Sequence, residues 1–293
     1  MSESGRVAFR HAVVFAVGAQ FCVNLGSGLA VNAFAVVGPA GIVLLRNGIP
    51  AALLLIWARP RLRGLTRRAW AALVAYGLML AAMNSVFYEA LEVMPMGEAV
   101  TIEMLGPLTL AVALVRRWRA WLWAALALGG VCLLSGFDPA TLGARGTLLA
   151  LAAGAFWATY IVATRQVGRE FGGGRGMARG LALGMAVSTV ACLPRGVAAL
   201  AAAPFTWEVV GWGTAVAVSA SLIPYAMEMA ALRGMSAATF GVMTALAPGS
   251  AALIGWLVAG QTLTWWAVGG MALVTVASAG AAWGDPNRRP ATP

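Results

Sequence analysis

The sequence has no lysine, one histidine, three cysteines and only ten acidic residues among 293. A single histidine, His11, excludes a histidine-based metal cluster and argues against a histidine general base. Cys22, Cys132 and Cys192 are far apart and have neither metal-ligand nor disulfide-framework spacing, so we interpret them as small packing residues. These absences predict a protein without a bound metal or cofactor.

Charge of either sign is scarce. Charged residues make up 10% of the chain and hydrophobic residues 61%, which is far outside the range of soluble globular domains. The sequence therefore predicts an all-α integral membrane protein in contact with lipid. Ten apolar windows of about 20 residues, the length that crosses ~30 Å of hydrocarbon as a helix, lie at 12–32, 39–58, 69–89, 97–115, 119–137, 146–165, 179–200, 209–232, 239–259 and 263–283.

All twenty basic residues are arginine, and their distribution predicts the topology. If the N-terminus is cytoplasmic, seventeen of the twenty fall on the cytoplasmic side, Arg145 and Arg195 fall outside, and Arg46 lies within the second span. This bias indicates that both termini of the multi-pass protein are cytoplasmic. It also explains the net charge of +10 without a nucleic-acid partner. A composition rich in Ala, Gly and Arg without Lys resembles that of a GC-rich bacterial genome, so we expect a bacterial inner membrane. The tail 285–293 is short and polar, and we expect it to be disordered.

The chain contains a weak internal repeat. A shift of 141 residues places Met94 over Met235, Leu105 over Leu246 and Pro107 over Pro248. With five spans in each copy, 1–141 and 142–284, the second copy enters the membrane in the opposite orientation. Such inverted repeats are typical of secondary transporters, whose substrate sites lie near the membrane midplane between the repeats.

Prolines interrupt three of the predicted spans, as Gly106-Pro107, Pro224 and Pro248-Gly249. A proline removes a backbone donor and frees the carbonyl one turn earlier, which lipid does not satisfy. Each break is therefore a candidate cavity wall. The alternative for each is a packing kink without substrate contact.

Four of the ten acidic residues lie between positions 89 and 108. We interpret Glu92 and Glu98 as solvated rim residues beside the turn at Pro95, and leave Glu89 open between rim and cavity. Glu103 lies about six residues, ~9 Å, inside the fourth span. A carboxylate at that depth costs about 2.5 to 3.5 kcal/mol unless it is paired, protonated or functional.

Glu228, one turn after Pro224, is the second carboxylate that the sequence places deep within a predicted span. We predict that Glu103 and Glu228 face a cavity, and the alternative is a structural ion pair. Arg46 is the intramembrane counter-ion that the sequence offers, and we expect it to serve in such a pair.

Amides and aromatic residues complete the predicted pocket. Asn84 and Tyr88 share one face of the third span at i and i+4, and Trp157 and Tyr160 share a face of the sixth at i and i+3. Tyr225 adjoins Pro224. Core packing is the alternative for each aromatic residue.

Five segments together resemble a known family. They are MNSVFY at 83–88, MPMGEAVTIEMLGPL at 94–108, FWATYI at 156–161, IPYAMEMAAL at 223–232 and TFGVMTALAP at 239–248. They resemble the drug/metabolite transporter superfamily and its EamA-type ten-helix carriers, most closely the bacterial threonine/homoserine exporter group. The resemblance implies an inverted five-plus-five repeat and efflux of small amino acids or related metabolites, driven by the proton gradient.

By position, family-like residues stand at Asn84, Tyr88, Glu103, Trp157, Tyr160, Tyr225 and Glu228. Two positions depart from the pattern, because Ala247 and Gln261 stand where many members carry Glu. Either departure could alter the substrate or the coupling.

The resulting hypothesis is a small-molecule transporter coupled to protons. Glu103 would hold the substrate ammonium or exchange it for a proton, and Asn84, Tyr160 or a broken helix end would hold the substrate carboxylate. A carrier of an aromatic amino acid, a cationic drug or a sugar conjugate remains an alternative on the same scaffold, and a channel is a more remote one. An intramembrane enzyme is not expected, because the spans contain no paired-Asp, His-Glu or Ser-His-Asp set.

Overall fold

The computed structural model describes residues 3–115, 118–134, 143–172, 175–203, 206–234, 240 and 243–283. Within these ranges the chain is helical and contains no strand, as the predicted all-α class requires. The helices of the first half are α1 (Glu3–Ala58), α2 (Arg67–Val93), α3 (Met96–Glu103), α4 (Leu105–Val115) and α5 (Trp118–Leu134). Those of the second are α6 (Ala144–Phe171), α7 (Arg175–Ala202), α8 (Trp207–Ala217), a π-helix η2 (Val218–Leu222), α9 (Ile223–Gly234), α11 (Ala247–Ala259) and α12 (Trp265–Trp283). The predicted tail 285–293 lies outside the described residues.

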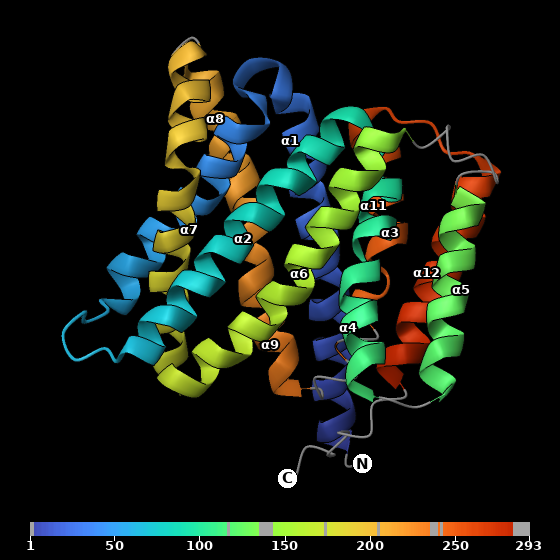
Figure 1. Cartoon of the computed structure of the whole chain (residues 1–293), viewed down its shortest axis with the longest axis horizontal. Helices are drawn as coiled ribbons and strands as arrows, with labels where there is room; N and C mark the ends of the chain where they lie inside the picture. Colours follow the sequence, from blue (N-terminus) through green and yellow to red (C-terminus); the bar gives the residue numbers. More distant parts are fainter. Residues whose placement is uncertain are drawn as a thin grey trace.

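The first two predicted spans both belong to α1, which changes direction at Gly38 (Figure 1). Gly38 has φ 71° and ψ 161°, a conformation that a residue with a Cβ rarely adopts. Pro39 follows, and its fixed φ suits the first position of the second helical stretch. A glycine and a proline thus replace the loop expected between 32 and 39.

Two other predicted spans are interrupted inside the molecule. The fourth consists of α3 and α4, which meet at Met104, and the eighth consists of α8, η2 and α9 in succession. Short π-helical segments are rare and occur frequently at functional sites. Both interruptions lie beside the cavity described below.

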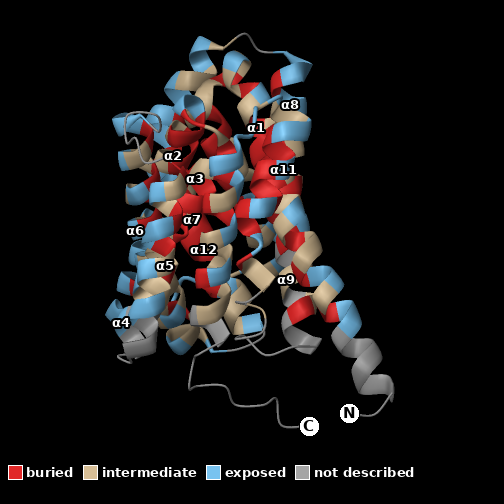
Figure 2. Ribbon diagram, turned by 90° about the vertical axis from the view of Figure 1, so that its right-hand side faces the viewer, coloured by how far each residue is buried: buried red, intermediate tan, exposed pale blue. Residues whose placement is uncertain are grey.

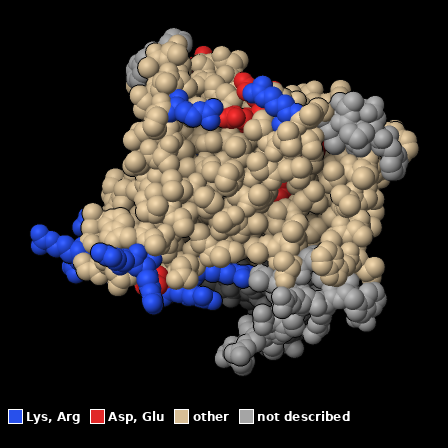
Figure 3. All heavy atoms as spheres, viewed as in Figure 1, with Lys and Arg blue, Asp and Glu red and all other residues tan. Residues whose placement is uncertain are grey.

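Four stretches are long and apolar enough to cross a membrane by length and composition, namely Arg10–Ala58, Arg67–Val93, Ala144–Phe171 and Arg175–Ala202. Shorter apolar helices cover Trp121–Leu134, Ala247–Ala259 and Trp265–Gly280. Figure 3 shows a broad, almost uncharged band across one face, with basic and acidic side chains gathered above and below it. This distribution is the one that a lipid bilayer selects.

The helices pack around a buried centre (Figure 2). α1 contacts α7, α8, α9 and α11, α2 contacts α6 and α7, and α5 pairs with α12. Many of the fully buried residues are alanines, such as Ala30, Ala153 and Ala251, which allow helices to approach closely. Large apolar side chains such as Ile56, Trp121 and Leu148 are exposed on the outside, where lipid would cover them.

Candidate functional site

A cavity of about 230 Å³ lies inside the molecule, between helices from both halves of the chain. The sequence-predicted residues that line it are Arg46 from α1, Asn84 from α2, Glu103 from α3, Trp157 and Tyr160 from α6, and Glu228 from α9. Further polar groups come from α1 and η2, and the apolar lining includes Leu80, Met83, Phe87 and Val100. Residues separated by up to about two hundred positions thus converge on one space.

Glu103 is buried, with 7% of its surface exposed, and it ends α3 where that helix meets α4. The break can pass so close to α6 because glycines stand on both sides of the contact. A Cβ at Gly154 would lie 2.5 Å from the carbonyl oxygen of Glu103, and a Cβ at Gly106 would collide with the carbonyl of Gly154. The contact with α6 therefore fixes the position of this carboxylate.

Arg46 does not form the ion pair that we predicted. Its Nη1 donates a 2.8 Å hydrogen bond to the hydroxyl of Tyr88, and its guanidinium carbon lies 5.1 Å from the centre of the Tyr88 ring. Within the described ranges no carboxylate lies within 4 Å of it. The aromatic ring and hydroxyl of Tyr88 take the place of a counter-ion, so the remaining guanidinium donors are left for a ligand.

Tyr88 itself does not line the cavity, contrary to its predicted role in binding substrate. It is fully buried, and its ring packs edge-on against Phe34 and Phe87. Its hydroxyl accepts the hydrogen bond from Arg46, and its ring lies beside the Arg46 guanidinium. Tyr225 belongs to α9, but its side chain lies outside the described part of the structure.

Five polar residues that line the cavity were missed by the sequence interpretation: Gln20, Asn24 and Ser27 from the first half of α1, Asn47 beside Arg46, and Ser221 of η2. The first three are spaced i, i+4 and i+7, which places them on one face of a helix. That polar stripe in an otherwise apolar span was the signal that could have revealed them.

Asn24 connects the first helix to the start of α11. Its Nδ2 donates to the carbonyl of Ala247 at 3.2 Å and to the hydroxyl of Ser250 at 2.7 Å. All three groups are buried. The bonds satisfy a carbonyl in the first turn of α11 and connect the two walls of the cavity.

Asn47 and Asn84 form a second buried network. Asn84 Nδ2 donates to Asn47 Oδ1 at 3.0 Å, and Asn47 Nδ2 donates to Ser188 Oγ at 3.1 Å. The asparagine that we expected to hold a substrate carboxylate thus already uses its amide nitrogen within the protein. The role assigned to Asn84 is better filled by Arg46.

The two departures from the family pattern lie in different places. Ala247 lines the cavity, where its methyl group leaves space. Gln261 is not a lining residue. Its Oε1 accepts a 2.9 Å hydrogen bond from the backbone N–H of Met96, the first residue of α3.

Of the outer acidic residues, Glu92 is exposed and Glu98 half-buried in the first turn of α3. The sequence left the position of Glu89 open between rim and cavity. Glu89 does not line the cavity, and 23% of its side chain is exposed. It forms a 2.7 Å ion pair with Arg195 of α7.

The three prolines that were predicted to break helices all lie within the first turn of a helix that follows an interruption. Pro107 is the third residue of α4, Pro224 the second of α9 and Pro248 the second of α11. Proline suits these positions because the N–H that it lacks has no intrahelical partner there. They begin the new segments, and the interruptions precede them at Met104, in η2 and before Ala247.

Chemically, the cavity offers two carboxylates, one guanidinium group, several amides and hydroxyls, and three aromatic side chains. Opposite charges in one small cavity suit a solute that carries both an ammonium and a carboxylate group. Membrane helices interrupted beside such a site define the class of protein as an integral membrane carrier.

Comparison with known proteins agrees with this class. A model of the EamA-like transporter family matches residues 144–283. The threonine/homoserine exporter RhtA of Salmonella typhimurium is 32% identical over 248 residues, which are 84% of this chain and 82% of the relative. RhtA of Escherichia coli K12 is 31% identical over 254 residues, 86% of this chain and 84% of the relative. The chain belongs to the EamA-like transporter family.

The fold also has a counterpart among solved structures. One crystal structure covers 96% of this chain and 97% of its own, with a TM-score of 0.57 and 20% sequence identity. At that identity the likeness supports the fold alone. The family membership confirms the predicted resemblance and the expectation of a transporter rather than an enzyme.

Proposed function

We propose that this protein exports small amino acids of the threonine and homoserine kind from the cytoplasm across a bacterial inner membrane, by proton antiport with alternating access. The observation that carries the proposal is the shared location of Glu103, Glu228 and Arg46 on one cavity. The curated relatives named above, which are called threonine/homoserine exporters, supply the substrate class.

The size of the cavity supports a small substrate. Pockets for drug-sized ligands have volumes of about 300 to 1,000 Å³, whereas this cavity has about 230 Å³. Its lining is also more polar than a drug-binding pocket requires. An amino acid with a short hydroxylated side chain fits both properties.

A binding mode follows from the charges. The substrate ammonium would lie between Glu103 and Glu228, and the substrate carboxylate would accept hydrogen bonds from the Arg46 donors that Tyr88 does not use. Gln20, Ser27 and Ser221 line the same cavity and would bind the substrate hydroxyl. Trp157 and Tyr160 would close one side around the aliphatic carbons.

Proton coupling would use the same carboxylates. A charged carboxylate inside a bilayer needs a cation nearby, and the substrate ammonium or a proton satisfies that need equally. Glu103 would therefore release the substrate when it takes up a proton from the outer side. The exchange makes export depend on the proton gradient.

An inverted repeat, with copies at 1–141 and 142–284, is part of the proposal. When a two-fold axis relates two segments, residues close to the axis contact the equivalent residues of the other segment. Asn47 and Ser188, which are 141 positions apart, form a direct hydrogen bond. This separation equals the shift that aligned the two halves of the sequence.

Other contacts follow the same rule. The second half of α1 packs on α7, and α5 packs on α12, which are equivalent pairs in the proposed repeat. A Cβ at Gly130 would lie 2.9 Å from the carbonyl oxygen of Gly270, and a Cβ at Gly270 would lie 2.5 Å from that of Gly130. Their separation of 140 positions is one less than the shift that aligned the two halves, so this reciprocal contact lies close to the proposed axis. Ten spans in this arrangement place both termini in the cytoplasm.

A carrier for another substrate on the same scaffold is the second candidate. It is favoured by Ala247, which lines the cavity where the resemblance expects a carboxylate, so that an aromatic amino acid or another metabolite gains space. Competition by unlabelled aromatic amino acids, cationic drugs and sugar conjugates against labelled threonine distinguishes the two candidates.

The test is uptake of labelled threonine and homoserine into proteoliposomes, with and without an imposed pH gradient. We expect gradient-driven accumulation by the wild type and its loss in Glu103→Gln, with the folded protein retained. Glu92→Gln, at an exposed position in the same part of the chain, is the matched control and should transport normally. Retained proton-dependent accumulation in Glu103→Gln would contradict the coupling role.

A further inference from the structure

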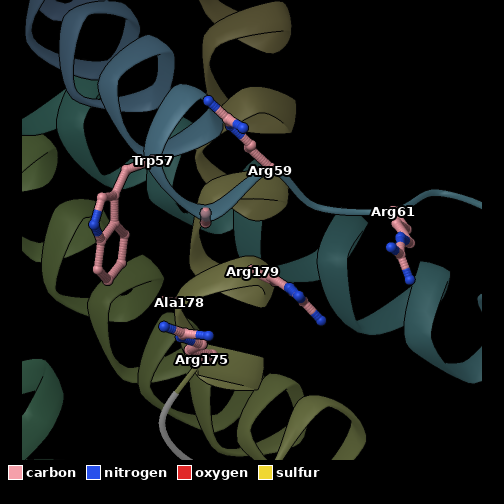
Figure 4. Close-up of a pocket in the computed structure, with 7 residues that line it drawn as sticks. Trp57, Arg59, Arg61, Arg175, Ala178 and Arg179 are labelled. Atoms are coloured by element: carbon pink, nitrogen blue, oxygen red, sulfur yellow. The ribbon is translucent and has the colours of Figure 1, made fainter.

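A second hollow, of about 380 Å³, lies at the end of α1 and the beginning of α7, apart from the cavity above (Figure 4). It is lined by Trp57, Arg59 and Arg61 from the end of α1 and the segment after it, and by Arg175, Ala178 and Arg179 from the first turns of α7. Four arginine side chains therefore line one hollow that two distant parts of the chain create.

These arginines are uncompensated. Within the described ranges none of the four has a carboxylate within 4 Å, and none of their side chains forms a hydrogen bond. Arg175 and Arg179 lie in the first turns of a 28-residue helix, where the helix dipole is positive and cations are unfavourable. Among the described residues, no ion pair neutralises these four side chains.

The general preference for arginine in cytoplasmic segments explains why these residues are basic, but it does not explain why they converge. Convergence depends on the end of α1, where Arg59 has φ 43°, a left-handed conformation that non-glycine residues rarely adopt. Figure 4 shows Arg59 projecting from this turn above the Arg175 and Arg179 side chains.

The position of the hollow favours a lipid as the source of the missing charge. It lies at the end of the molecule where α1 begins, next to the uncharged band (Figures 1 and 3). Trp57 lines it with 69% of its surface exposed, and tryptophan is typical of the boundary between headgroups and acyl chains. Arginine forks bind phosphate oxygens in pairs.

We propose that this hollow, Arg59, Arg61, Arg175 and Arg179 with Trp57 at its edge, binds the phosphate of an anionic phospholipid from the cytoplasmic leaflet. The guanidinium groups hold the headgroup phosphate, and Trp57 contacts the start of the acyl chains. The lipid thereby joins the end of α1 to the beginning of α7. The site is independent of the transported substrate.

The experiment measures lipid binding to the full-length, delipidated protein in detergent by native mass spectrometry. The probes are phosphatidylglycerol, phosphatidylcholine as the zwitterionic control, and inorganic phosphate. The pocket variant carries Arg59→Gln, Arg175→Gln and Arg179→Gln. The control carries Arg63→Gln, Arg67→Gln and Arg68→Gln, which remove the same charge from exposed positions of the segment before and at the start of α2.

We expect the wild type to bind phosphatidylglycerol about tenfold more tightly than phosphatidylcholine, and the pocket variant to lose about tenfold where the control loses less than about threefold. Equal losses in both variants would overturn the proposal in favour of diffuse surface charge. Displacement of the lipid by millimolar inorganic phosphate, without preference between the two lipids, would assign the hollow to a soluble phosphate compound instead. If the pocket variant does not fold, Arg59→Gln and Arg179→Gln are compared singly with Arg63→Gln, and equal binding by all three overturns the proposal.

Discussion

Arg46 is the residue whose role changes most between sequence and structure. It was expected to neutralise an intramembrane carboxylate, yet its hydrogen-bond partner is Tyr88, and it lines the same cavity as Glu103 and Glu228. A cation held by an aromatic residue keeps donors available for a ligand. This arrangement supports the proposed contact between Arg46 and the substrate carboxylate.

Replacement of Arg46 by lysine should therefore weaken substrate binding. Lysine keeps the charge but loses the planar pair of donors, so we expect KM to rise about tenfold with a smaller change in the maximal rate. Transport kinetics in proteoliposomes measure both constants. Tyr88→Phe, which removes only the hydroxyl that accepts the Arg46 bond, should raise KM by a smaller factor. An unchanged KM in Arg46→Lys would contradict the contact.

Asn24 permits a stability prediction that is separate from transport. Asn24→Ala removes two buried hydrogen bonds between α1 and α11, to the Ala247 carbonyl and to the Ser250 hydroxyl, each worth about 0.5 to 1.5 kcal/mol. The midpoint of thermal unfolding in detergent should fall accordingly. Asn32→Ala is the control, because Asn32 Nδ2 donates to the Val258 carbonyl at an exposed site and water can replace it.

At this scale the sequence predicted the residues that are chemically costly in a membrane. Glu103 and Glu228 stood out because charge is rare in the spans, and both line the cavity. The amide residues did not stand out, because asparagine and glutamine are uncharged and also occur in helices that line no binding site. Only the packing of α1 against η2 and α11 brings Asn24 and Gln20 to the same space.

Among the α-helices that contribute to the cavity, α3 is the shortest, with eight residues, and its stability depends on how its ends are capped. Its first residue, Met96, is fully buried and donates its N–H to Gln261 from the segment between α11 and α12. Its N-cap residue is Pro95, whose side chain makes no capping hydrogen bond. Gln261 therefore supplies the cap from a distant part of the chain.

Gln261→Ala should destabilise the protein by about 0.5 to 2 kcal/mol, the usual cost of losing a helix N-cap. Gln166→Ala is a suitable control, because Gln166 bonds only to Glu170 along the same helix at 3.4 Å. Thermal unfolding in detergent compares the two. A stable Gln261→Ala protein with altered substrate preference would instead place this residue in the selectivity of the carrier.

Most helix boundaries followed from hydrophobic windows, whereas the interruptions did not. Prolines 107, 224 and 248 marked the right spans, but the breaks precede them. The departure at Met104 arises from the contact between the α3–α4 junction and Gly154 of α6. The sequence of a single span contains no information about that neighbour.

For the molecule as a whole, the proposed mechanism requires the two halves to move against each other. The Glu89–Arg195 ion pair joins α2 of the first half to α7 of the second. Arg195 is 69% exposed, so the pair contributes at most about 1 kcal/mol to stability. It is weak enough to break and reform in every cycle.

A covalent link at this point should stop transport. Cysteines in place of Glu89 and Arg195, in a chain whose Cys22, Cys132 and Cys192 are replaced by alanine, can be joined by a short reducible cross-linker. We expect transport to disappear on cross-linking and to return on reduction. The same reagent on the variant with Glu89→Cys alone should have no effect, and full activity while cross-linked would contradict the movement of α2 relative to α7.

The membrane class and the family were predictable at this scale, because composition and five short motifs carry them. The repeat predicted that the two halves pack against each other, but its few identities did not indicate which residues would be in contact. Asn47 and Ser188 illustrate the reason, because nothing in an asparagine and a serine indicates that they are partners. Their bond exists because helices from both halves meet there.

The composite lining of the cavity has a consequence for the gene. Arg46, Asn84 and Glu103 are encoded before the segment 135–142, and Trp157, Tyr160 and Glu228 after it. A gene divided within that segment would produce two polypeptides, neither of which encodes a complete binding site. Cells carrying either fragment should fail to resist toxic concentrations of the exported amino acid, and cells carrying both should regain resistance by complementation.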